Sequence, residues 1–135
     1  MKIVIFFSFF CLVLWSCSNS NSQSKDKEQK DTLGLTDISQ KIRKNPLNAE
    51  LFDKRAAIYW SILKVDSAIN DAIIATRLDS MNDDYSLHLA DYYFKSIKIQ
   101  DAIQVLQKFL ERKPQSLKAL TRIGKYFSYL KDYKK

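Results

Sequence analysis

Hydrophobic side chains in the second half of the chain recur every three or four residues, which is the spacing of one face of an α-helix. Phe52, Ala56 and Tyr59 follow this spacing, and so do Ile69 and Ile73 farther along the chain. Polar and charged residues fill the positions between them. The pattern predicts helices over residues 35–44, 49–63, 66–78, 83–97, 100–112 and 117–130.

Residues that begin and end helices stand at matching places. Asn48, Asn82 and Ser116 precede three of the predicted helices, and each is a preferred N-cap residue. Lys113-Pro114 ends the helix over 100–112, because a residue before proline is driven away from helical backbone angles. The 135 residues include only two glycines and two prolines, where average usage gives about nine and about seven. Pattern and composition together predict an all-α domain.

The predicted helices repeat with a 34-residue period. Three series of residues share this step: a small residue, an aromatic residue and a residue that ends a helix (Ala56, Ala90, Gly124; Tyr59, Tyr93, Phe127; Pro46, Ser80, Pro114). Ala68 and Ala102 are spaced in the same way. A fixed period of this length indicates stacked helical units, each of which buries its apolar face against its neighbours.

The period and the residue types resemble the tetratricopeptide repeat (TPR), a pair of antiparallel helices, A and B. In that family the small series is position eight, where helix A packs closest to helix B, and the aromatic series is position eleven. Phe109, at the usually small position twenty-seven, and Ser80, in place of a proline, depart from the pattern. The resemblance implies a short right-handed solenoid with two full repeats, about 49–82 and 83–116, helix A of a third at 117–135, and one amino-terminal helix.

The resemblance also implies a binding surface, because TPR arrays bind partners along the concave face formed by their A helices. We therefore expect an unidentified envelope protein or peptide to bind at Glu50, Asp53, Trp60, Asp84, His88, Asp91, Phe94, Lys118, Arg122 and Lys125. The groove would change from acidic and aromatic to basic along this series. Lys118 and Arg122 match two positions of the carboxylate-clamp subclass, which binds chaperone tails, but its other three positions do not match. A merely solvated face is the alternative for these side chains.

The helix predicted over 117–130 carries an apolar stripe of Leu120, Ile123, Phe127 and Leu130. Helix B of the same repeat usually covers this stripe in the TPR family. The third copy reaches only position nineteen, and residues 131–135 resemble the turn into helix B. Either a partner or a second copy of the chain covers the stripe, or the chain is a truncated copy of a longer array.

The first residues have the pattern of an export signal. Met1-Lys2 precedes a 13-residue apolar run over 3–15, which has the length of a signal-peptide core and falls short of the about 20 residues that span a bilayer. Leu14-Trp15-Ser16-Cys17 resembles the lipobox of bacterial lipoproteins, whose cysteine is lipidated after the signal is cleaved. The resemblance implies a signal peptide at 1–16 and a lipid anchor on Cys17. An ordinary secretory signal with an incidental cysteine is the alternative.

Residues 17–33 are then expected to be the lipidated cysteine and a flexible tether, followed by the helical domain at 34–135. Residues 18–32 contain no aromatic or aliphatic side chain and cannot form a core. Two or three acyl chains hold a protein at a membrane, whereas one does so only marginally. We expect a location in the bacterial cell envelope, with the outer membrane favoured over the inner one.

The formal net charge of +7 belongs to one end of the chain. Residues 1–107 carry 13 bases and 13 acids, whereas residues 108–135 carry nine bases and two acids. Binding of a membrane surface or polyanion by this basic end is therefore an alternative function. Nucleic acid is not expected as a partner of an exported lipoprotein.

Side chains that could carry catalysis are scarce in the sequence. His88 is the only histidine, and no nucleophile or metal-ligand pattern accompanies it. Asp83-Asp84 stands at a predicted helix start, where acids offset the helix dipole. No glycine-rich phosphate loop occurs. We therefore expect no enzyme, no cofactor and no bound metal.

Overall fold

Residues 33–133, the part of the chain that the computed structural model describes, are helical apart from short connections. A helix over residues 33–44 is followed by α2 (Ala49–Ser61), α3 (Val65–Leu78), α4 (Asp83–Lys95), α5 (Ile99–Arg112) and α6 (Leu117–Tyr133). These residues contain six helices and no strand, which confirms the all-α prediction. The predicted signal peptide, Cys17 and nearly all of the tether lie outside the described residues.

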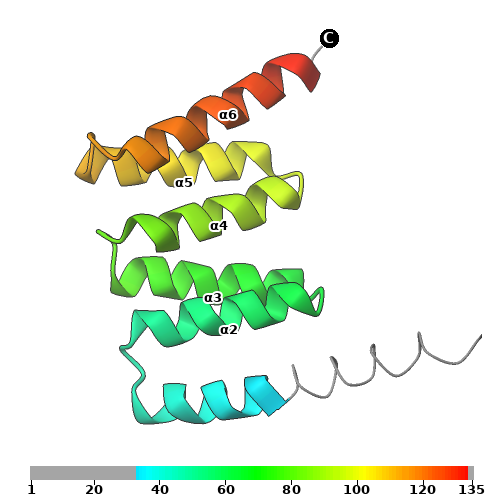
Figure 1. Ribbon diagram of the computed structural model, residues 1–135, viewed down its shortest axis with the longest axis vertical. Coiled ribbons are helices and arrows are strands. Elements are labelled where there is room, and N and C mark those ends of the chain that lie inside the picture. Colours follow the sequence, from blue (N-terminus) through cyan, green and yellow to red (C-terminus); the bar gives the residue numbers. More distant parts are fainter. Residues whose placement is uncertain (1–32, 134–135) are drawn as a thin grey trace, which may run out of the picture.

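Consecutive helices run antiparallel and stack into a column, with the helix over 33–44 at one end and α6 at the other (Figure 1). α2 packs on α3 and α4 packs on α5, and contacts of α3 with α4 and of α5 with α6 join successive pairs. α4 also contacts α6 directly. The helices α2, α4 and α6 are therefore the A helices of three successive repeats, as the period in the sequence predicted.

The small residues of the repeating pattern lie where helices approach most closely. Ala56, Ala68, Ala75, Ala90 and Ala102 all have no exposed surface. A methyl group at these positions lets two helix backbones come together without a cavity, which a larger side chain would prevent. The spacing of small residues thus marks the helix–helix contacts of the first two repeats, whereas Gly124, the third member of the series with Ala56 and Ala90, is exposed on α6.

Phe109, the departure from this pattern, is also fully buried. It belongs to the core cluster that joins α4, α5 and α6 and includes Leu106, Ala119 and Tyr126. The large ring near the end of α5 thus belongs to the same cluster as the small Ala119 at the start of α6.

The predicted N-cap residues are confirmed. Asn48 Oδ1 accepts a hydrogen bond of 3.0 Å from the backbone N–H of Glu50, and Asn82 Oδ1 accepts one of the same length from Asp84. Ser116 Oγ accepts from the N–H of Ala119 at 3.3 Å. Each cap satisfies a backbone donor that the first helical turn leaves without a partner.

The A helices α2 and α4 end two residues earlier than the spacing predicted. Leu63 and Ile97, which we expected to be helical, have φ angles of 61° and 63°, in the left-handed region. This conformation reverses the chain so that helix B can pack back on helix A. The two side chains consequently point to solvent, with exposed fractions of 84% and 77%. Leu63 continues the helical spacing of Phe52, Ala56 and Tyr59, which predicts a place on their apolar face, and this prediction is wrong.

The turn predicted for residues 131–135 is wrong as far as the structure describes them, because α6 continues to Tyr133. Lys131 has the register of Leu63 and Ile97 but stays helical. In the first two repeats, helix B packs on helix A. This packing offsets the conformational free energy that the left-handed backbone of Leu63 or Ile97 costs. No helix of the described residues packs on α6 in this way, so its backbone retains helical hydrogen bonds.

The apolar stripe predicted on α6 is divided between two environments. Ile123 and Leu130 pack against the core cluster of α4 and α5, whereas Leu120 and Phe127 are 44% and 48% exposed. At about 100° per residue, Ile123 and Leu130 lie at one edge of the stripe and Leu120 and Phe127 at the other, and only the first edge faces α4 and α5. Half of the stripe is therefore core, and half is surface.

Candidate functional site

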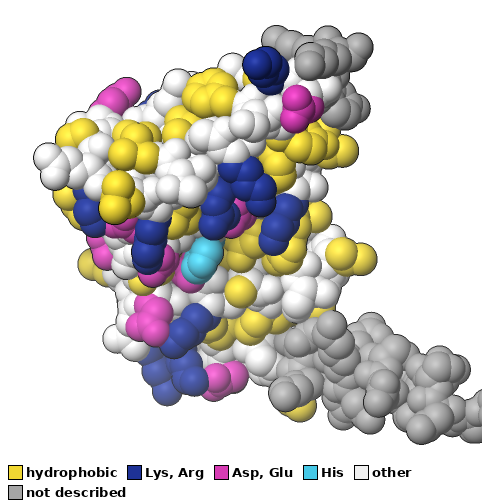
Figure 2. All heavy atoms as spheres, turned by 45° about the horizontal axis from the view of Figure 1, so that its top comes forward, with side chains coloured by type: hydrophobic (Ala, Val, Ile, Leu, Met, Phe, Trp, Pro, Cys, Tyr) yellow, Lys and Arg dark blue, Asp and Glu magenta, His cyan; other side chains and the backbone are white. Residues whose placement is uncertain are grey.

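The predicted partner-binding residues lie along the faces of the A helices, and a groove runs between α4 and α6. Its volume is about 600 Å³. Figure 2 shows basic and acidic side chains and the histidine gathered on this face. The lining residues are Asp84, Leu87, His88, Asp91, Leu117, Lys118, Thr121 and Arg122. Five of the ten predicted site residues therefore share one groove.

Acids of one repeat pair with bases of the next along this face. Asp53 Oδ1 lies 2.9 Å from His88 Nδ1, and the two side chains come from neighbouring A helices. Lys118 Nζ of α6 lies 2.8 Å from Asp84 Oδ1 of α4. Arg122 of α6 pairs with Asp91 of α4. The structure thus neutralises locally the acidic-to-basic gradient that the sequence order implied.

The pair of Asp91 and Arg122 is the most enclosed of these contacts. Arg122 donates to one carboxylate oxygen of Asp91, and the Tyr126 hydroxyl donates to the other. Burial alone would raise the pKa of Asp91, but these hydrogen bonds outweigh it, so that the pKa is lowered. Burial, together with the bond to Asp91, raises the pKa of Tyr126. The cluster therefore holds a fixed ion pair at neutral pH and offers no free base for catalysis.

His88 lies in the middle of the groove with its side chain about half exposed. Its hydrogen bond to Asp53 raises the pKa of the imidazole, and burial opposes this effect. A protonated imidazole is favoured because Asp53, Asp84 and Asp91 all lie close enough to act on it. His88 thus binds a proton more readily than a free imidazole does, because Asp53 and the other acids lie around it.

Aromatic rings connect the repeats in a regular series. Trp60 of α2 stacks on Tyr92 of α4 with ring centroids 4.8 Å apart, and Phe94 of α4 stacks on Tyr126 of α6 at 4.4 Å. The second contact is the first one moved along the chain by one repeat. Tyr129 meets Phe94 edge-on at 5.1 Å. Trp60 and Phe94, both predicted as binding residues, therefore also hold adjacent repeats together.

Sequence reasoning missed Tyr92 and Tyr126 as partners of these rings. Both are buried, with exposed fractions of 8% and 1%. The available signal was that Tyr92 and Tyr126 are one period apart, as Trp60 and Phe94 are. The spacing alone does not reveal that a ring in one repeat stacks on a ring of the next.

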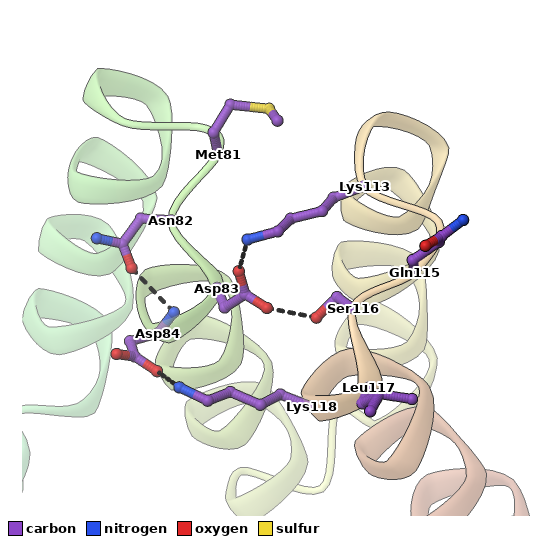
Figure 3. A pocket seen from close by; sticks show the side chains of 9 residues that line it. All are labelled: Met81, Asn82, Asp83, Asp84, Lys113, Gln115, Ser116, Leu117 and Lys118. Atoms are coloured by element: carbon purple, nitrogen blue, oxygen red, sulfur yellow. Dashed lines mark hydrogen bonds and ion pairs between the residues drawn. The ribbon is translucent and has the colours of Figure 1, made fainter.

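A second hollow, of about 550 Å³, lies beside the start of α4 (Figure 3). Lys113 and Ser116, from the connection between α5 and α6, both reach the carboxylate of Asp83 (Figure 3). The bond from Lys113, and next that from Ser116, lower the pKa of Asp83. Asp83 and Asp84 stand in the first turn of α4, as predicted for a favourable dipole interaction. Asp83 thus ties the start of α4 to the connection between α5 and α6, and Asp84 joins α4 to Lys118 of α6.

The remaining predicted site residues lie apart from the groove. Glu50 forms an exposed ion pair with Lys54 on the same helix, at 2.5 Å. Lys125 is exposed and makes no ion pair with any described residue. Within residues 33–133, no group of three His, Cys, Asp or Glu side chains could hold a metal ion. In the same residues, every helix is too short or too polar to cross a bilayer.

Comparisons with known proteins agree on the fold. No protein-family model matches the sequence, and no curated protein is significantly similar to it. Among solved structures, a thermophilic TPR protein of Thermus thermophilus superposes with a TM-score of 0.67 at 22% identity, over 82% of this chain and 55% of that one. The first TPR of Spaghetti (RPAP3), bound to the HSP90 peptide SRMEEVD, gives 0.63 at 20% identity, over 82% and 87%.

The second TPR domain of human RPAP3, in complex with the HSP70 peptide SGPTIEEVD, gives a TM-score of 0.60 at 24% identity, over 78% of this chain and 88% of that chain. Residues 33–133 thus have a TPR-like helical fold, which confirms the fold inferred from the repeat period. These identities establish the fold and leave the predicted lipobox and lipidation of Cys17 as predictions.

Proposed function

We propose that this protein is a membrane-anchored bacterial lipoprotein whose TPR-like domain is an adaptor for another envelope protein or peptide. The observation that carries the proposal is the groove between α4 and α6, which is open and lined by polar side chains of two A helices. Two of the similar TPR structures hold a bound peptide. No enzymatic activity is part of the proposal.

The ion pairs of the groove indicate what kind of partner fits. Asp84 and Lys118 are 58% and 63% exposed, so a ligand can replace either partner at little cost. Asp91 and Arg122 are more enclosed and also bonded to Tyr126, which makes them harder to separate. A peptide that brings both donors and acceptors replaces these interactions, whereas a purely anionic tail would leave Asp84 without its cation. The groove therefore favours a polar peptide of mixed charge.

Binding of polyanions or membrane surfaces through the basic end is the second candidate. Three of its bases, Lys113, Lys118 and Arg122, are already paired with Asp83, Asp84 and Asp91 of α4. Their positive charge is therefore largely cancelled within the domain. This pairing favours the adaptor over the polyanion binder.

Photo-crosslinking from the groove tests the adaptor. A photoreactive amino acid replaces Thr121, which lines the groove, or Gln104, which is exposed on α5. Neither residue makes a side-chain contact that holds the fold in the described structure, so both variants should fold. In cells that express the full chain, we expect a discrete adduct from position 121 and none from position 104. Equal adducts from both positions, or none from either, would contradict groove binding.

The anchor is tested separately with Cys17→Ser in the full chain. Loss of the thiol removes the atom that would carry the lipid. We expect the unaltered protein to fractionate with membranes after a high-salt wash, and its mass to show an acylated amino-terminal cysteine. An unmodified Cys17, or identical membrane fractionation and mass for both chains, would refute the lipidation proposal while leaving the groove proposal intact.

A further inference from the structure

One edge of the solenoid carries three exposed apolar side chains. This edge, which we call the turn edge, is formed by the start of the helix over 33–44 and by the connections over 62–64 and 96–98, which lie on the same side of the column (Figure 1). Leu33, Leu63 and Ile97 belong to it and are 66%, 84% and 77% exposed. Single exposed apolar residues are common on protein surfaces, so the backbone conformation decides whether these need an explanation.

Leu63 and Ile97 adopt a backbone conformation that their side chains disfavour. Their φ angles of 61° and 63° are the only positive values among the described residues. Glycine or asparagine adopts this conformation with little strain, whereas a β-branched isoleucine is a clear outlier there. The turns need the conformation but not these side chains, because neither side chain packs in the core. Strain that recurs at the same place in two repeats points to a function outside the fold.

A lysine follows each of these two residues. Lys64 and Lys98 are exposed, and neither forms an ion pair with a described residue. A lysine has an apolar stem and a charged end, so an apolar residue beside it suits the boundary between acyl chains and lipid headgroups. Asp66 and Asp101 follow in the first turns of α3 and α5. The apolar tips, rather than the net charge, therefore distinguish this edge.

The opposite edge exposes apolar residues of a different kind. Leu47 and Met81, from the connections before α2 and α4, are 81% and 52% exposed, but neither has a positive φ angle. Met81 also lines the hollow beside α4. The chain enters the described domain at Leu33, so an anchor on Cys17 would be joined to the turn edge, whereas the opposite edge lies across helices about 20 Å long. An amino-terminal anchor would therefore hold the turn edge beside a bilayer.

We propose that the turn edge rests on a lipid bilayer, with Leu63 and Ile97 inserted at the boundary of the acyl chains and Lys64 and Lys98 beside the lipid phosphates. The membrane location rests on the proposed function, and the contact of the turns with lipid is a separate claim. The tips are separate points on neighbouring repeats rather than a groove, and a fluid lipid surface accepts such points without a complementary shape. No lining residue of the groove between α4 and α6 belongs to the turn edge, so the two sites can be altered separately.

Site-specific photo-crosslinking to lipid tests this contact. A photoreactive amino acid with an apolar diazirine side chain replaces Leu63 or Ile97 in the full chain, or Leu47 or Met81 as controls on the opposite edge. Each chain is bound to vesicles of phosphatidylethanolamine and phosphatidylglycerol and irradiated, and its lipid adducts are measured by mass spectrometry. We expect at least about fivefold more adducts from positions 63 and 97 than from 47 and 81. Most of these adducts should persist at high salt, because salt does not screen the burial of apolar side chains.

Substitutions at position 63 separate the apolar tip from the turn. Leu63→Asn introduces a residue that tolerates the left-handed conformation, so it should melt no lower than the unaltered chain, and Leu63→Met keeps an apolar tip. With the photoreactive residue at position 97, we expect Leu63→Asn to lower the adduct yield about threefold or more and Leu63→Met to retain most of it. Leu47→Asn, on the opposite edge, should leave the yield from position 97 unchanged.

The proposal fails if the four positions give equal adducts or none gives any, since the turn edge would then have no preferred contact with lipid. Adducts that disappear at high salt would assign the contact to charged residues and overturn the insertion of the tips. An undiminished yield from position 97 in Leu63→Asn would overturn it as well. An unmodified Cys17 with the expected adducts would refute the lipid anchor and leave the turn edge standing, whereas a lipidated Cys17 with equal adducts would refute the turn edge alone.

Discussion

A buried ion pair in the first repeat provides the sharpest test of how this domain is held together. Arg55 Nε and Nη2 donate to the two carboxylate oxygens of Asp71, at 2.6 and 2.8 Å. The Asp71 side chain is 2% exposed and that of Arg55 is 19% exposed. Arg55 Nη1 also donates to Ser39 Oγ at 3.3 Å, which connects the pair to the helix over 33–44. The pair thus joins three helices at one end of the solenoid.

The second repeat fills the same positions with apolar residues. Leu89 and Val105 are the residues one period after Arg55 and Asp71, and they lie in or against one core cluster. The fold therefore accommodates a hydrophobic contact in this register. We use these two residues as the replacements in a double-mutant cycle.

The two single variants should be costly and the double variant should not. Arg55→Leu leaves the Asp71 carboxylate buried without its partner, which costs about 3–5 kcal/mol. Asp71→Val leaves a guanidinium that is partly solvated and lies 5.6 Å from the ring of Phe52, so we expect a smaller loss of about 2–3 kcal/mol. With both charges gone, the free energy of unfolding should return to within about 1 kcal/mol of the unaltered chain, or exceed it.

Urea unfolding followed by circular dichroism at a fixed pH measures all four chains. Equal m-values are required, because they show that each variant exposes the same surface on unfolding. Recovery in the double variant would show that the site requires complementarity rather than charge. A double variant as unstable as the worse single variant would refute the reasoning, since the ion pair would then be indispensable in itself.

Three further predictions concern single side chains. Ser86 is fully buried, and its hydroxyl has no hydrogen-bond partner in the described structure. Ser86→Ala should therefore raise the free energy of unfolding by about 1 kcal/mol. A loss of stability in this variant would contradict the prediction. Ile97 is exposed with φ of 63°, so Ile97→Gly should stabilise by about 0.5–1 kcal/mol, whereas Ile97→Ala, the control, should not. His88 has a raised pKa because of Asp53, so its stabilising effect is complete below its ordinary pKa of about 6.5 and disappears as pH rises through the folded-state value. The Tm difference between the unaltered chain and His88→Gln should therefore be largest in acid, and an increase toward alkaline pH would refute the assignment.

The sequence by itself determined the helices, their order and their pairing. Helix periodicity, the N-caps Asn48, Asn82 and Ser116, and the repeat period sufficed, because a solenoid is built from contacts between units adjacent in sequence. Each repeat reproduces the packing of the one before it, so a pattern of small and aromatic residues identifies the interfaces. The lipobox prediction at Cys17 likewise rests on the sequence alone.

Only the tertiary structure decided which of the predicted groove residues are free to bind. Asp91 and Arg122 lie 31 positions apart in sequence, a separation that differs from the period, and nothing in the repeat pattern indicates that they meet. Ion pairing depends on separations of a few ångströms and on side-chain rotamers, whereas periodicity reports only the face of a helix. For the same reason, the sequence assigned the whole apolar stripe of α6 to one surface, and the structure divided it into a buried half and a face that remains uncovered.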